Sequence, residues 1–139
     1  RVTASTEHEG FFTELFANRH SMMADEPLKY GGTDRGPSPY EYLLAALGAC
    51  TSMTLQMYAR HKELPLDKAI VRLTHQKIHA EDCEHCESKN GKIDRMEREI
   101  ELIGPLDNEQ RQRLLEIAER CPVHKTLHSE VEIISKLKD

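Results

Sequence analysis

The chain has 139 residues, of which 38% are hydrophobic, and carries a formal net charge of -5. Acidic and basic residues are mixed along it without a basic stripe, which argues against nucleic-acid binding. No apolar run approaches the length that crosses a bilayer, and residues 1–25 lack the apolar segment of a signal peptide. We therefore expect a cytoplasmic protein that binds neither nucleic acid nor membrane.

The length suits one domain over residues 1–139. The mean hydropathy of -0.63 is low, which fits either a monomer with a thin core or an oligomer that shares one. Four cysteines without a secretory signal indicate a reducing compartment, where thiols are catalytic or metal-binding more often than structural.

The N-terminal part reads as strands. Residues 2–6 and 11–16 are predicted to form two strands around a polar turn in which Gly10 can take a positive φ. A third short strand is expected at 20–24. An irregular loop rich in glycine and proline, residues 30–39, follows it.

A long helix comes next. Ser38 is a good N-cap, Pro39 suits the first helical position and Glu41 completes a capping box. Apolar and small residues recur at helical spacing from there to about Lys62. Because residues 45–50 are small and almost free of polar atoms, we expect this helix to be buried nearly all round, by sheets or by a partner chain.

The second half alternates strands and a helix. Residues 69–79 and 93–103 alternate as strands and are joined by the polar segment 80–92. Asp107, with Gln110 three residues on, predicts the start of a helix over about 108–120. Residues 129–136 are predicted to form a last strand.

Cys50 lies in the long helix and Cys121 closes the second one. A cysteine pair that a fold brings together can serve thiol redox chemistry, in which a thiolate attacks a peroxide and a second cysteine forms the disulfide. A reactive Cys50 needs a nearby cation or hydrogen-bond donor, for which Arg19, Arg35 and Arg60 are candidates. The alternative is that both cysteines are small core residues.

The segment 80–92 and its neighbours hold a second constellation. Cys83 and Cys86 form a Cys-x-x-Cys motif that is flanked by His75, His79 and His85. Thiolates and imidazoles can hold zinc in a tetrahedral site. A solvated loop and a local redox pair are the alternatives, and we assign no metal here.

Three segments resemble the OsmC/Ohr family of hydroperoxide-reducing proteins. They are residues 36–55 (GPSPYEYLLAALGACTSMTL), residues 119–127 (ERCPVHKTL) and residues 20–27 (HSMMADEP). The resemblance covers essentially the whole chain. It is the two cysteine motifs together that make it specific.

The resemblance implies an α+β, OsmC-like fold. A long central cysteine-bearing helix and a second helix would pack with antiparallel sheets in an intertwined homodimer. It also implies that Cys50 is the peroxidatic cysteine and Cys121 the resolving one, in a peroxiredoxin-like reductase of organic hydroperoxides. A dithiol would supply the electrons, and no bound cofactor is required.

Two positions depart from the typical family pattern. The glutamate that usually follows the helix-starting proline is replaced by Tyr40, and the acid stands one step later at Glu41. The first hairpin turn carries no arginine, so Arg19 in the next turn is our candidate for the activating cation. We assign Glu41 and Arg19 to the catalytic set with Cys50 and Cys121. Glu41 has an equal alternative as a capping residue.

His124, three residues after Cys121, is a candidate for orienting a substrate or a thiolate, or an ordinary helix-end histidine. The rival function is a non-catalytic binding or accessory domain with the same fold, or a redox protein that has lost peroxidase activity.

Overall fold

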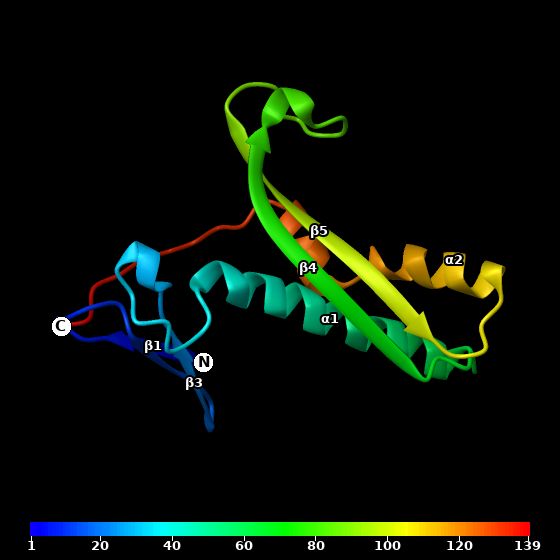
Figure 1. Ribbon diagram of the computed structural model, residues 1–139, viewed down its shortest axis with the longest axis horizontal. Coiled ribbons are helices and arrows are strands. Elements are labelled where there is room, and N and C mark those ends of the chain that lie inside the picture. The colour runs from blue at the N-terminus through cyan, green and yellow to red at the C-terminus, as the bar shows by residue number, and fades with distance from the viewer. The chain divides into compact units, whose positions relative to one another are not determined.

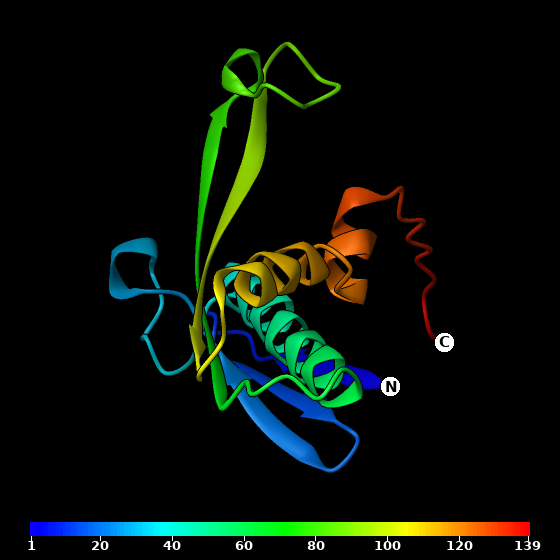
Figure 2. The ribbon, with the colours of Figure 1, turned by 90° about the vertical axis from the view of Figure 1, so that its right-hand side faces the viewer.

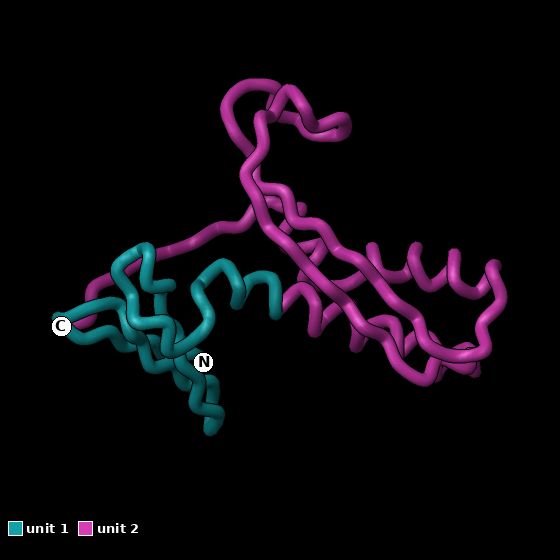
Figure 3. Tube along the Cα trace, in the orientation of Figure 1, with its two compact units in different colours: residues 1–45 teal, residues 46–139 magenta.

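The computed structural model describes residues 1–139 (Figure 1). It divides into two compact units, residues 1–45 and residues 46–139, which Figure 3 shows in different colours. The boundary falls within the helix over Pro39–His61, and each unit is described by itself.

The first unit contains a three-stranded antiparallel sheet. Strands β1 (Val2–Thr6), β2 (Thr13–Ala17) and β3 (His20–Ala24) pair in the order β1-β2-β3. The β2–β3 turn contains Asn18 in the left-handed region, with φ at 56°. Asparagine tolerates this conformation better than most residues, which allows so tight a connection. The three strands predicted from the sequence are therefore confirmed, with small shifts at the ends of β2.

After β3 the chain folds around one buried carboxylate, that of Asp25, which is 2% exposed. Thr33 donates its hydroxyl to this carboxylate at 2.5 Å, and the backbone N–H groups of Glu26 and Arg35 donate at 2.8 and 3.2 Å. The short 3-10 helix η1 (Leu28–Tyr30) lies inside the same loop. One side chain therefore holds together a segment that has almost no regular structure of its own.

Asp25 makes this loop sensitive to acid. The hydroxyl of Thr33 is the largest cause that lowers the pKa of Asp25, to about 2, with backbone N–H groups adding to it and burial opposing it. The folded pKa lies below the unfolded value of about 3.9, so the stabilisation is complete above that value and is lost as the pH falls through about 2. We expect Asp25→Asn to be less stable than the unmodified chain at neutral pH. Chemical denaturation at a series of pH values should show this gap closing toward pH 2, and a gap that is independent of pH would contradict the assignment.

Helix α1 (Pro39–His61) begins as its sequence predicts. The Ser38 N–H donates to Glu41 Oε1 at 2.9 Å, and the Glu41 N–H donates to Ser38 Oγ at 3.3 Å, which is a capping box. Neither α1 nor any other helix of the structure combines the length and the apolar character that a membrane span needs.

The expectation that α1 is buried nearly all round holds for one face only. Leu47, Thr51, Leu55 and Ala59 recur every four residues and are buried. The methionines of the opposite face, Met53 and Met57, are 65% and 68% exposed. Within a single chain this helix therefore keeps an uncovered apolar face.

The second unit contains a long antiparallel hairpin with helices on one side. Strands β4 (Lys68–His79) and β5 (Lys92–Ile103) pair along their whole length. Figure 2 shows that α1 and α2 (Asn108–Ala118) lie on the same face of this hairpin. A Cβ on Gly48 would lie 2.7 Å from Leu73 Cδ1, so glycine lets α1 approach the sheet closely.

The core of this unit lies between α1, α2 and the hairpin. Leu55 and Leu114 are completely buried at its centre. Asp107 caps α2 with Gln110 in a complete capping box, as the sequence predicts. The α+β class is therefore confirmed, with helices packed on antiparallel strands.

The C-terminal region differs from the prediction. A short third helix, α3 (Pro122–His128), follows α2, with Pro122 at its first turn. The strand predicted at 129–136 is wrong, because this segment has no regular structure in the single chain. Its apolar residues Val131, Ile133 and Ile134 are 54%, 84% and 80% exposed, and no strand pairs with this segment.

Candidate active site

The fold brings Cys50 and Cys121 together. Cys50 lies in α1, and Cys121 is the N-cap residue of α3. Both are free thiols, and the Cys50 thiol lies within hydrogen-bonding reach of the Cys121 sulfur. Two residues that are far apart in sequence therefore meet inside the second unit, as the redox interpretation requires.

The two sulfurs differ in exposure. Cys121 is completely buried, whereas Cys50 is only half-buried. A small molecule that approaches the pair from solvent therefore has better access to Cys50. Cys121 can be reached mainly through its neighbour.

Cys121 is placed to carry a negative charge. Burial works to raise the pKa of its thiol, but interactions with the Cys50 thiol, the His124 N–H, the Thr51 hydroxyl and the Val123 N–H together outweigh it and lower the pKa. The Val123 and His124 N–H groups belong to the first turn of α3, where backbone donors have no partner within the helix. Pro122 contributes no N–H at this helix start.

A nearly buried arginine lies beside the pair. The side chain of Arg98, from β5, is only 11% exposed. Its Nη1 donates to Thr51 Oγ1 at 2.9 Å, and its Nη2 lies 3.0 Å from His124 Nδ1. Because Thr51 also faces Cys121, Arg98 is linked to the thiol through one side chain. The Arg98 guanidinium therefore links β5 to α1 through Thr51 and to α3 through His124.

His124 completes this network. Its Nδ1 faces Arg98 and its Nε2 lies 3.2 Å from Glu119 Oε2. Burial lowers the pKa of His124 first, and the charge of Arg98 lowers it further, while Glu119 works in the opposite direction. A neutral ring with its proton on Nε2 satisfies both neighbours, since Nδ1 then accepts from Arg98. The ring also stacks on His128, with the centroids 4.9 Å apart.

The other predicted residues lie in the first unit. Glu41 is engaged in the capping box with Ser38. Arg19 stands in the β2–β3 turn, and the Arg35 guanidinium lies 3.8 Å from the centre of the Phe12 ring. A catalytic role for Glu41 or Arg19 stays a prediction.

Sequence reasoning missed Arg98. The signal was present, because Met96, Arg98 and Ile100 alternate along β5 and two of the three are apolar. Arg98 pairs with Leu73 of β4, which faces Gly48 of α1. A charge at an inward position of a strand is rare enough to indicate a buried polar network.

Removing the Arg98 guanidinium should destabilise the protein. Arg98→Met would leave Thr51, His124 and the Ala118 carbonyl without their donor, which should lower the free energy of unfolding by about 1–3 kcal/mol. Urea unfolding measures this. Arg72→Met, in the same hairpin, is the control, since its ion pair with Glu101 is exposed and should be worth no more than about 1 kcal/mol. Equal losses in the two variants would contradict a special role for Arg98.

Nowhere in residues 1–139 do three or more histidine, cysteine, aspartate or glutamate side chains gather as metal ligands. Cys83 and Cys86, which the sequence analysis considered as zinc ligands, are joined by a disulfide.

Fold and site together define a class: a small α+β protein in which a half-buried thiol on a long helix contacts a buried thiol at a second helix start. A family model described as OsmC-like protein matches residues 32–136. The chain therefore belongs to the OsmC-like protein family. Among proteins with curated descriptions, none matches its sequence.

Solved structures show the same fold. An OsmC-like protein from Mycoplasma pneumoniae is similar with a TM-score of 0.72 and 19% identity, over 92% of this chain and 86% of that one. An organic hydroperoxide resistance protein OsmC from Legionella pneumophila gives 0.66 and 15%, over 91% and 87%. The organic hydroperoxide resistance protein OhrB of Bacillus subtilis gives 0.64 and 21%, over 95% and 92%. At these identities the likeness establishes the fold.

Proposed function

We propose that this protein reduces organic hydroperoxides with two cysteines, Cys50 as the peroxidatic residue and Cys121 as the resolving one. The observation that carries the proposal is the contact between an accessible thiol and a buried thiol whose pKa is lowered. Two of the similar structures are described as organic hydroperoxide resistance proteins, which supports the substrate class.

The proposed reaction has two chemical steps. The Cys50 thiolate attacks the terminal oxygen of the hydroperoxide, the O–O bond breaks, and the leaving alkoxide takes a proton to become an alcohol. Cys50 is left as a sulfenic acid. The Cys121 thiolate then attacks the Cys50 sulfur, forms the disulfide and releases hydroxide, which is protonated to water.

The lowered pKa of Cys121 suits the second step. Resolution needs a thiolate at Cys121, and its surroundings favour the charged sulfur despite burial. Arg98 and His124 act as positioning residues in this proposal, since they hold Thr51 and the start of α3 in place. Glu41 and Arg19 remain candidates for contact with the peroxide.

A dithiol completes the cycle in this proposal. It reduces the Cys50–Cys121 disulfide by thiol–disulfide exchange and leaves as a disulfide itself, so the net electrons come from the dithiol. No bound cofactor is required for this chemistry. A reducing cytoplasm, where such dithiols are maintained, is the proposed location.

We also propose that residues 1–139 form one OsmC-like domain and that two chains associate as an intertwined homodimer. The family model crosses the boundary between the two compact units, which supports a single domain. The uncovered α1 face with Met53 and Met57, and the exposed apolar residues of 129–139, support a second copy as the cover.

A charge on the uncovered face should break the dimer. We expect Met57→Asp to sediment as a monomer, because an unpaired carboxylate would be buried at the interface. Met57→Leu, which keeps the face apolar, is the matched control and should remain dimeric. Analytical ultracentrifugation distinguishes them, and a monomeric unmodified chain would contradict the homodimer.

The function is tested by kinetics. The reduced protein is mixed with cumene hydroperoxide and dithiothreitol, and loss of the peroxide is followed over time. We expect turnover well above the rate with dithiothreitol alone, and faster than with hydrogen peroxide at the same concentration. A rate equal to the background would favour the alternative, a non-catalytic OsmC-fold accessory domain.

A further inference from the structure

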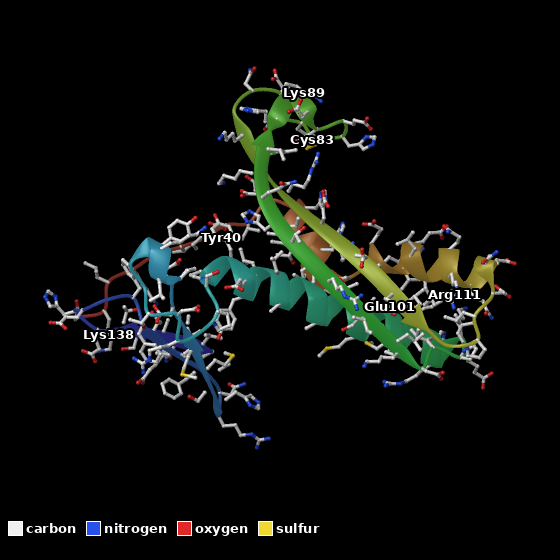
Figure 4. All side chains as sticks on the ribbon, in the orientation of Figure 1. Tyr40, Cys83, Lys89, Glu101, Arg111 and Lys138 are labelled. Carbon is white, nitrogen blue, oxygen red and sulfur yellow. A yellow bond between two sulfur atoms is a disulfide. The ribbon has the colours of Figure 1, made fainter.

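A second pair of cysteines lies away from the proposed active site. The disulfide between Cys83 and Cys86 has its Cα atoms 5.6 Å apart and stands in the hairpin tip, residues 80–91, between β4 and β5. Figure 4 shows Cys83 and Lys89 at the end of the hairpin that extends beyond the helices. The proposed peroxide chemistry does not use this pair.

This disulfide contributes little to holding the fold together. Only Glu84 and His85 separate the two cysteines, so the bond closes a very short loop and links no distant elements. The two intervening side chains are 89% and 96% exposed. Ala80 is the only buried residue of the tip.

A shallow hollow lies where the tip joins β4 and β5. Its volume is about 330 Å³, and His79, Lys89 and Lys92 line it together with Glu81. Lys89 Nζ lies 3.4 Å from the Cys83 carbonyl oxygen, and Glu81, Asp82, Glu84 and Glu87 add negative charges to the same segment.

A metal site explains the pair less well. Two thiolates supply half of a tetrahedral zinc shell, and the histidines nearby do not complete it, since no group of three ligands forms here or elsewhere in the chain. A half-buried Cys-x-x-Cys disulfide in a short loop whose intervening residues are exposed is instead the arrangement of a pair that exchanges with other thiols.

We propose that Cys83–Cys86 is a second redox site, which exchanges electrons with an external thiol reductant. Two molecules of a monothiol, or one of a dithiol, attack and open the disulfide in two steps through a mixed disulfide. The reductant leaves as its own disulfide, and Cys83 and Cys86 become thiols. The site is independent of whether Cys50 and Cys121 reduce peroxides.

The test uses a chain in which only this pair can react. The double variant Cys50→Ser/Cys121→Ser is equilibrated in glutathione buffers that range from oxidised to reduced. Free thiols are then alkylated and counted by mass spectrometry. We expect a reversible change between a disulfide and two thiols within this range, with the far-ultraviolet circular dichroism unchanged. Cys83→Ser/Cys86→Ser in the same background is the control and should show no change.

Three results would overturn the proposal. The disulfide could resist reduction until the chain is unfolded by denaturant, which would make it structural. The two thiols could stay reduced even in the oxidised buffers. They could also retain stoichiometric zinc that protects them from oxidation. Should the double variant not fold, the same titration on the unmodified chain, followed on the peptide that contains Cys83 and Cys86, gives the answer separately from Cys50 and Cys121.

Discussion

Replacing Cys50 by serine is expected to reduce hydroperoxide consumption to the rate of the reductant alone. A serine hydroxyl is not ionised at neutral pH and is a poor nucleophile toward peroxide oxygen, so no sulfenic acid can form. Cys50 is also the more accessible thiol of the pair, so the buried Cys121 is not expected to replace it. The measurement is the loss of cumene hydroperoxide in the presence of dithiothreitol.

Two further variants test whether the loss of activity is specific to the Cys50 thiol. Ser52→Ala changes another small polar residue of α1, whose hydroxyl only donates to the Ala49 carbonyl, and should keep most of the activity. Cys121→Ser should still react once, because Cys50 is intact, and then hold Cys50 as a sulfenic acid that dimedone can trap. Full turnover by the Cys50→Ser protein would eliminate the proposed mechanism.

The largest effect on stability is expected from Leu114→Ala. Leu114 of α2 is completely buried in the core formed with α1 and the hairpin. Removing most of this side chain loses its transfer free energy and leaves a cavity, which together should lower the free energy of unfolding by about 2–5 kcal/mol. Because domains of this size are marginally stable, such a loss is a large part of the total.

The neighbouring leucine provides the control for this prediction. Leu115 lies on the same helix but is 49% exposed, so Leu115→Ala should cost less than about 1 kcal/mol. Urea unfolding of both variants, compared at the same slope, gives the two values. Similar losses at the two positions would mean that α2 does not pack as described.

Most of the fold could be predicted from the sequence because its signals are local. The Ser38–Glu41 and Asp107–Gln110 capping boxes predicted the starts of α1 and α2. The alternation of side chains predicted the two strands of the long hairpin. The strand predicted at 129–136 failed for a non-local reason. A strand needs a partner edge, and the local sequence carries no information about whether one is present.

The candidate site could be predicted only in part. The meeting of Cys50 and Cys121 was proposed from a resemblance to a family, since their spacing alone could not establish it. Arg98 was missed because its partners, Thr51 and His124, come from other elements. Which residues share a buried polar network depends on tertiary packing, and a pattern along one strand shows only that such a network is needed.

The electrostatics of the pair also depend on packing. Burial by itself would make Cys121 an inert thiol, and its neighbours reverse that effect. Some of those neighbours are backbone N–H groups of α3, a helix that sequence patterns did not predict. Whether the pKa of a buried thiol is raised or lowered therefore depends on the groups that it contacts.

Disulfide mapping after exposure to peroxide tests the central claim most directly. The fully reduced protein is treated with one equivalent of cumene hydroperoxide, the remaining thiols are alkylated, and the peptides are identified by mass spectrometry. We predict a new bond between Cys50 and Cys121, formed as the peroxide is consumed. Free Cys50 and Cys121 in the treated protein, with the peroxide left unreacted or with oxidation confined to Cys83 and Cys86, would contradict this account.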